Sequence, residues 1–184
     1  RSSSRSNRSQ PRRSASRIVT ICRQILSSRH SLPGASVSWR RSIFTCCAAG
    51  LPLFCISIGV TVGDELVAGV IDAPVLGQVF AAADGPATLN GREITPRETR
   101  PAPDALVLSG YPGQRTGSRF PEFAASAVRT LEDSVSAVRH LGSAALELAY
   151  VAAGWADATA LTAINSWDVA AGFHIVRRCL LYTS

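Results

Sequence analysis

Residues 54–62 alternate between larger apolar side chains and small or polar ones, which constrains the fold of this chain more than any other feature. A period of two is typical of a β-strand, because successive side chains point to opposite faces of a sheet. The larger residues of the run are Phe54, Ile56, Ile58, Val60 and Val62. Gly63 and Asp64 then supply a tight turn, and residues 65–74 form a second apolar run. The pattern predicts a β-hairpin.

The same region invites a second interpretation. Residues 43–63 carry no charge and follow an arginine-rich segment, which resembles a signal anchor. Gly50, Pro52 and Gly59 interrupt that stretch, and a membrane helix has no need of alternation. We therefore predict a strand and no membrane association.

Further along the chain, strand and helix patterns alternate. Extended segments are predicted at 78–85, 105–112, 136–140 and 156–163, with a turn at 89–92. Helical spacing appears at 120–131, where Phe123, Ala127 and Leu131 share one stripe. Residues 144–154 are apolar nearly all round, so that helix must be buried. A last helix is predicted to open at Trp167 and Asp168 and to run to residue 178. This order predicts a layered α/β domain.

Charge is distributed unevenly. All 19 basic residues are arginine; ten of them precede residue 42, and the first acid is Asp64. The serine- and arginine-rich start has no hydrophobic period and is predicted to be disordered. It could act as an arm for RNA or for a membrane surface, but no aromatic residues interleave the arginines to stack bases. We favour a segment without a selected role and predict no nucleic-acid partner.

Five cysteines, Cys22, Cys46, Cys47, Cys55 and Cys179, show no CxxC spacing. That pattern predicts neither a zinc site nor a disulfide framework. Reduced thiols in a cytoplasmic protein are the expectation.

Two motifs carry a resemblance. Gly-Ser-Ala-Ala at 142–145 opens the apolar helix, and Trp-Asp-Val-Ala-Ala-Gly stands about 25 residues later at 167–172. Together with the hairpin, these segments resemble the later part of the inositol monophosphatase family. The resemblance implies the layered α/β sandwich of the inositol monophosphatase and fructose-1,6-bisphosphatase type, truncated here at both ends.

The resemblance also implies a chemistry, the Mg²⁺-dependent hydrolysis of a small phosphate monoester. Asp168 corresponds to a carboxylate ligand of a magnesium ion. Gly142, Ser143 and Ala144 correspond to a turn that lets the alcohol portion of the substrate approach. Leu161 stands where inositol-specific members carry a glutamate that binds a sugar hydroxyl, so inositol specificity is not implied. Each position has a simpler alternative: Asp168 could cap its helix, and Ser143 could be an N-cap.

The resemblance fails before residue 50. The family's Asp-Pro-Ile-Asp-Gly-Thr motif, which supplies two metal carboxylates, is replaced by residues without any acid. We therefore assign no catalytic residue, and we expect the chain as given to be inactive. We expect residues 1–49 to be disordered or non-native, residues 50–176 to form a partial family domain, and residues 177–184 to be a tail foreign to the family. The resemblance allows a homodimer. The alternative function is a noncatalytic binding protein of the same fold with a basic N-terminal arm.

Overall fold

The predicted hairpin forms the centre of the larger of two sheets. The computed structural model describes residues 35–42, 50–162 and 164–179. Strands β2 (Cys55–Val62) and β3 (Glu65–Ala73) pair antiparallel across the turn at Gly63 and Asp64. The alternating pattern is thus confirmed as a strand. Among the described residues, no helix has the length and apolar character needed to cross a membrane.

The sheet around this hairpin has six antiparallel strands in the order β1-β2-β3-β4-β5-β6. The remaining members are β1 (Ala35–Ser42), β4 (Gln78–Ala82), β5 (Thr88–Leu89) and β6 (Arg92–Glu93). Strand β1 lies within the first 49 residues, where the sequence analysis expects no element, and it pairs with the whole of β2. The prediction of disorder for residues 1–49 cannot be compared at 1–34 and 43–49, because those residues lie outside the described part of the chain. Residues 180–184 of the predicted tail lie outside it as well.

A second, smaller sheet is parallel, in the order β8-β7-β9. It consists of β7 (Leu106–Ser109), β8 (Ala137–Arg139) and β9 (Ala158–Ala160). The 3-10 turn Ala102–Asp104 precedes β7, and helices α3 (Gly113–Arg119) and α4 (Pro121–Ser134) link β7 to β8. Helices α5 (Ala144–Ala152) and α6 (Ser166–Arg178) complete the chain. Parallel neighbours need such helical crossovers.

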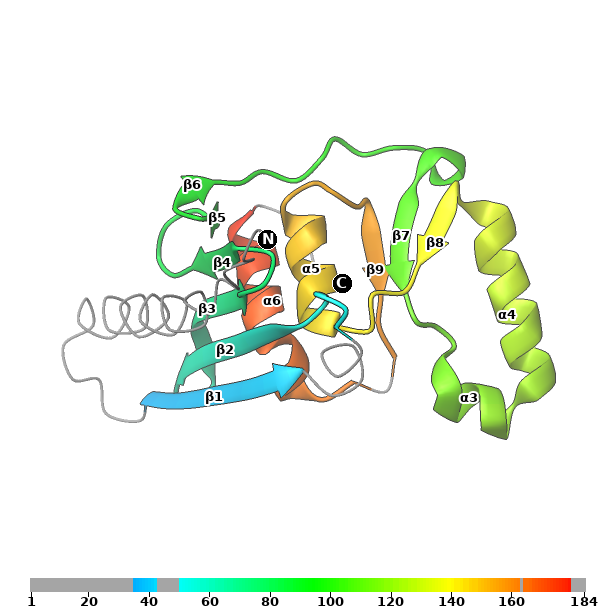
Figure 1. Cartoon of the computed structure of the whole chain (residues 1–184), viewed down its shortest axis with the longest axis horizontal. Helices are drawn as coiled ribbons and strands as arrows, with labels where there is room; N and C mark the ends of the chain where they lie inside the picture. The colour runs from blue at the N-terminus through cyan, green and yellow to red at the C-terminus, as the bar shows by residue number, and fades with distance from the viewer. Residues whose placement is uncertain (1–34, 43–49, 163, 180–184) are drawn as a thin grey trace, which may run out of the picture.

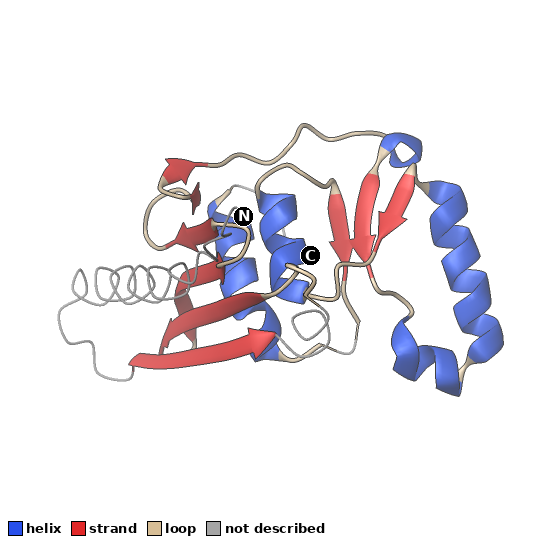
Figure 2. Ribbon diagram, in the orientation of Figure 1, coloured by secondary structure: helices blue, strands red, loops and turns tan. Residues whose placement is uncertain are grey.

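The layers follow from this connectivity. Helices α5 and α6 lie between the two sheets, and α4 lies on the outer face of the smaller sheet (Figure 1, Figure 2). The expected α/β sandwich is confirmed. The helix expected to be buried is buried: Ala145, Leu146, Leu148, Ala149 and Ala152 of α5 all belong to the main core.

Three details differ from the sequence analysis. The strand expected at 156–163 is limited to Ala158–Ala160. Helix α3 occupies residues 113–119, for which the sequence predicts no element. Helix α4 forms as predicted, but Phe123 of its stripe is 56% exposed and Ala124 is its buried residue. A stripe defines which residues share a face, and tertiary packing decides which face is covered.

Candidate functional site

The candidate site lies at one edge of the molecule, where the carboxyl ends of the parallel strands meet two helix starts. Strands β7, β8 and β9 all point to this edge, and both α5 and α6 begin there (Figure 1, Figure 2). Open α/β sheets bind ligands beyond the carboxyl ends of their strands. Helix N-termini add partial positive charge, which favours an anion.

Close packing of α5 on α6 fixes their relative register. Gly172 of α6 lies directly against the side chain of Leu148 on α5. Leu148 is four residues beyond Ala144, and Gly172 is four residues beyond Asp168. Because the two helices run in the same direction (Figure 1), equal numbers of residues give equal rise along them. Counting back from this contact leads to Ala144 on α5 and Asp168 on α6, each in the first turn of its helix.

The turn at residues 142–144 begins with a glycine in a left-handed conformation and continues with a serine whose side chain faces inward. Gly142 is exposed and adopts φ 75°, a left-handed conformation that favours glycine. Ser143 is only 2% exposed, and its hydroxyl accepts a hydrogen bond from the Leu146 amide at 3.5 Å. The Ser143 hydroxyl also lies 3.5 Å from the Cys55 thiol at the start of β2. Ser143 is thus the N-cap of α5, and the part of the turn that faces outward is the backbone at Gly142.

Asp168 is half-buried in the first turn of α6. Its Oδ2 accepts a hydrogen bond from the Asn165 side-chain amide at 3.2 Å, and its backbone N–H donates to the Asn165 carbonyl at 3.0 Å. Asn165 itself holds the N-cap position. The Asp168 carboxylate therefore has one exposed polar contact and retains capacity to accept more bonds.

Leu161 follows directly after β9 and packs, half-buried, against the main core. Its side chain offers no hydrogen-bonding group at this position.

Glu147 is a residue of this edge that the sequence analysis did not single out. It is 1% exposed, yet both carboxylate oxygens have partners. Oε1 accepts from the backbone N–H of Leu141 at 3.2 Å, and Oε2 accepts from the Thr159 hydroxyl at 3.2 Å. Burial raises the pKa of the Glu147 carboxyl, while these hydrogen bonds and the nearby His140 act in the opposite direction. The signal that could have revealed it is a single acid within an otherwise apolar helix.

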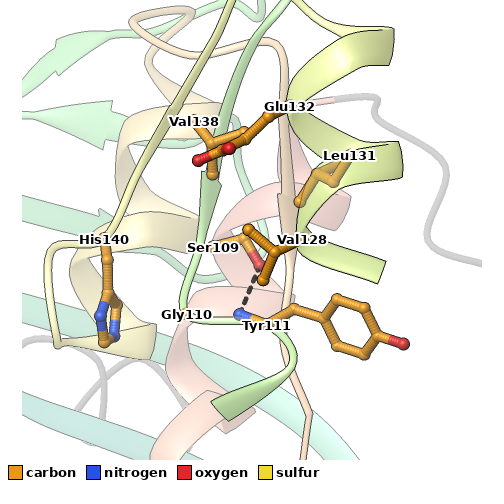
Figure 3. A pocket seen from close by; sticks show the side chains of 8 residues that line it. All are labelled: Ser109, Gly110, Tyr111, Val128, Leu131, Glu132, Val138 and His140. Atoms are coloured by element: carbon orange, nitrogen blue, oxygen red, sulfur yellow. Dashed lines mark hydrogen bonds between the residues drawn. The ribbon is translucent and has the colours of Figure 1, made fainter. Parts of the chain in front are cut away.

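A pocket of about 280 Å³ adjoins this edge on the α4 side of the smaller sheet (Figure 3). Its lining residues are Ser109, Gly110, Tyr111, Val128, Leu131, Glu132, Val138 and His140. The Ser109 hydroxyl donates to the Ala160 carbonyl at 2.7 Å and accepts from the Tyr111 N–H at 2.9 Å, which ties the loop after β7 to β9. The His140 ring covers Gly110 so closely that a Cβ there would collide with it. The Tyr111 ring points away from His140 (Figure 3).

Asp157 makes contacts that hold separate segments of the chain together. Its Oδ2 accepts from the Leu106 N–H at 2.8 Å and lies 3.6 Å from the Arg97 guanidinium. It joins the segment before the smaller sheet to the loop before β9.

The described residues do not fit a magnesium site by themselves. Among them, no three His, Cys, Asp or Glu side chains group together as ligands of one ion. Asp168 is the carboxylate that the resemblance assigns to Mg²⁺, and a hard cation of this kind takes about six oxygen ligands in octahedral geometry. Waters and substrate phosphates can fill several of these positions, but among the described residues Asp168 belongs to no group of three such side chains that could hold an ion.

The two sheets, the two helices between them and the edge where strand ends meet helix starts define a layered α/β protein. The profile of the inositol monophosphatase family matches residues 47–179. The chain belongs to the inositol monophosphatase family.

Individual relatives agree with this assignment. An inositol-1-monophosphatase of Mesorhizobium japonicum is 36% identical over 129 residues, which cover 70% of this chain and 48% of the relative. A protein of Thermotoga maritima named fructose-1,6-bisphosphatase/inositol-1-monophosphatase is also 36% identical over 129 residues, covering 70% and 47%. The chain thus spans about half the length of these relatives.

Solved structures show the same architecture. The inositol monophosphatase of Anabaena superposes with a TM-score of 0.71 at 26% identity, covering 91% of this chain and 71% of that one. The extragenic suppressor protein SuhB of Bartonella henselae gives a TM-score of 0.69 at 30% identity, covering 79% and 58%.

Proposed function

We propose that this chain carries the substrate-facing part of a site for a small phosphate monoester, in a family whose members hydrolyse such esters with Mg²⁺. The observation that carries the proposal is the close contact of Gly172 with Leu148, which lies four residues after Asp168 on α6 and four residues after Ala144 on α5. The 142–144 turn offers backbone toward an alcohol portion, and two helix N-termini favour the attached anion.

In this proposal the chain as given does not release phosphate. The hydrolysis of a phosphate monoester is extremely slow without catalysis, so it depends on groups that stabilise the developing charge. The 3.5 Å contact between Cys55 and Ser143 brings the start of β2 to the 142–144 turn. By resemblance the family's acidic motif precedes that strand, but here no acid precedes Asp64. The carboxylates expected at this edge are therefore missing from the sequence.

The alcohol portion of the ester is proposed to differ from inositol. Leu161 supplies an apolar surface where a hydrogen-bond acceptor would be needed for a sugar hydroxyl. Without an acceptor for its hydroxyl at this position, a polyol ester such as inositol phosphate binds more weakly and is selected less strongly over other esters.

The test is an assay of phosphate release from inositol 1-phosphate and from a panel of other small monoesters, with and without Mg²⁺. We expect no release above the rate without protein, for the chain and for Asp168→Asn alike. Release that rises with Mg²⁺ and is lost in Asp168→Asn would overturn the inactivity while supporting the assignment of Asp168.

The alternative, a noncatalytic binding protein, is favoured by the same absence of acids before Asp64. It predicts no release in that assay and no effect of phosphate esters on the amides of the 142–144 turn. The NMR shifts of the amides at 142–144 on addition of a phosphate ester therefore distinguish the two functions: the first predicts shifts, and the second predicts none.

A further inference from the structure

The single acid of helix α5 is buried beside the 142–144 turn. Glu147 is 1% exposed and is surrounded along its helix by Leu146, Leu148 and Ala149, which all belong to the core. A buried carboxylate without hydrogen bonds is strongly unfavourable, so its partners decide whether such a residue is tolerated. The partners of Glu147 are Leu141, which directly precedes the 142–144 turn, and Thr159 on the neighbouring strand β9.

The two oxygens of Glu147 join three elements. Oε1 holds the Leu141 amide, one residue before the turn, and Oε2 holds the Thr159 hydroxyl on β9. Because Glu147 itself lies on α5, the chain entering the turn is fixed to both the helix that follows it and the sheet beside it. Hydrogen bonds to a charged group are stronger than neutral ones.

The other end of the turn is fixed separately. Ser143 caps α5 and contacts Cys55 on β2, so its side chain faces inward. Gly142, between these two attachments, is the exposed residue and has φ 75°. The Gly142 backbone N–H also acts on the Glu147 carboxylate, where it lowers the pKa, so Glu147 and Ser143 together limit how far this backbone can turn.

We propose that Glu147 is the positioning residue of the 142–144 turn: its carboxylate holds the Leu141 amide and so sets the direction in which the Gly142 backbone faces the alcohol portion of a bound ester. The part of this inference that concerns the ester rests on the proposed function. The part that concerns the turn rests on the contacts of Glu147 alone.

The experiment uses the full chain labelled with ¹⁵N and two NMR readouts. The first is the hydrogen-exchange rate of the Leu141 amide, measured against the Leu148 amide in the core. The second is the set of amide shifts at Gly142, Ser143 and Ala144 on addition of inositol 1-phosphate. The variants are Glu147→Leu, which removes both acceptors; Glu147→Gln, which keeps one acceptor oxygen; and Glu122→Leu, the same change at an exposed acid of α4.

In Glu147→Leu we expect Leu141 exchange to accelerate about tenfold or more, because the acceptor of the Leu141 amide is lost. The shifts produced by inositol 1-phosphate at the turn should shrink or vanish. Glu147→Gln should restore slow exchange and the shifts, and Glu122→Leu should leave both unchanged. A folded Glu147→Leu with unchanged Leu141 exchange, or with unchanged shifts at the turn, overturns the proposal.

Two further outcomes are decisive. If the unmodified chain shows no shift at the turn with inositol 1-phosphate or with any other monoester of the panel, the proposed function fails, while the exchange result still decides whether Glu147 holds Leu141. If Glu147→Leu does not fold, a pH titration of the unmodified chain replaces it. In this titration the chain carries both ¹³C and ¹⁵N, so that the Glu147 carboxyl carbon and the Leu141 amide are followed together. Both shifts should change with the same pH midpoint. Different midpoints overturn the proposal.

Discussion

Gly172 of α6 lies so close to Leu148 of α5 that a Cβ on Gly172 would be 2.7 Å from the Cβ of Leu148. Real Cβ atoms do not approach this closely, so only glycine permits the present spacing of the two helices. Their spacing in turn sets how near Asp168 lies to the 142–144 turn. Gly69 of β3 plays the corresponding role on the other face of α6, where a Cβ would lie 2.5 Å from the Ala171 carbonyl oxygen.

We predict that Gly172→Ala destabilises the fold. Overpacking of a core costs about 1–3 kcal/mol, and the better helix propensity of alanine offsets about 0.5–1 kcal/mol of it. The free energy of unfolding, measured by urea denaturation, should therefore fall by about 1–2 kcal/mol. Gly117→Ala in α3 is the matched control, because nothing lies within 4 Å of its added Cβ. Equal stability of the two variants contradicts the close approach of α5 and α6.

The N-cap of α5 gives a second prediction. Ser143→Ala removes the acceptor for the Leu146 amide, and loss of such a cap costs about 1 kcal/mol. Ser126→Ala on the exposed side of α4 should be neutral or slightly stabilising. Urea denaturation again measures both, and a Ser143→Ala variant as stable as the unchanged chain would show that the cap contributes nothing.

The strands and helices were largely predictable because their patterns are local. The alternation of 54–62 follows from the two faces of a strand, and the apolar run of 144–154 follows from a helix that is covered nearly all round. Phe123 shows the limit of this reasoning, since nothing within α4 distinguishes a stripe that is covered from one that is not. Strand β1 shows another limit, because its pairing with β2 depends on a partner distant in sequence.

For the site, the motifs at 142–145 and 167–172 located the two helix starts through the resemblance. The register of these two helices could not be predicted, because it depends on the contact between Gly172 and Leu148, two residues on different helices. Glu147 escaped notice for a related reason. Its partners Leu141 and Thr159 precede and follow α5, and only the folded chain brings both to one carboxylate.

His174 predicts a pH dependence of stability. Its Nε2 lies 3.1 Å from the Ala83 carbonyl oxygen, and burial, the largest cause, lowers the pKa of His174 below its ordinary value of 6.5, with Arg178 adding repulsion. The unfolded chain therefore binds more protons than the folded one just below pH 6.5. The stability contributed by neutral His174 is present above that pH and is lost as the pH falls through the folded-state pKa.

The free energy of unfolding should accordingly decrease between pH 7.5 and pH 5, and His174→Gln should show a shallower decrease. Urea denaturation at several pH values measures both slopes. Identical slopes would assign the pH dependence to other groups.

Cys55 and Cys179 should resist labelling in the folded state. Both thiols are buried, and burial raises the pKa of each to about 11, so very little of the reactive thiolate exists at pH 8. Peptide mass spectrometry after brief treatment with iodoacetamide should find both residues unmodified, and both modified when urea is present. Rapid labelling of Cys55 in the folded chain contradicts its packing against Ser143.

The central claim is that the 142–144 turn and Asp168 form one edge that meets a phosphate ester, and amide NMR tests it most directly. Inositol 1-phosphate is added stepwise to the ¹⁵N-labelled chain, with inositol as the control that lacks the phosphate. We predict shifts at the amides of Gly142, Ser143 and Ala144 and in the first turn of α6 around Asp168, and no shifts at β5 and β6. Shifts confined to other elements, equal shifts with inositol alone, or no shifts with inositol 1-phosphate or any other monoester of the panel would contradict the account.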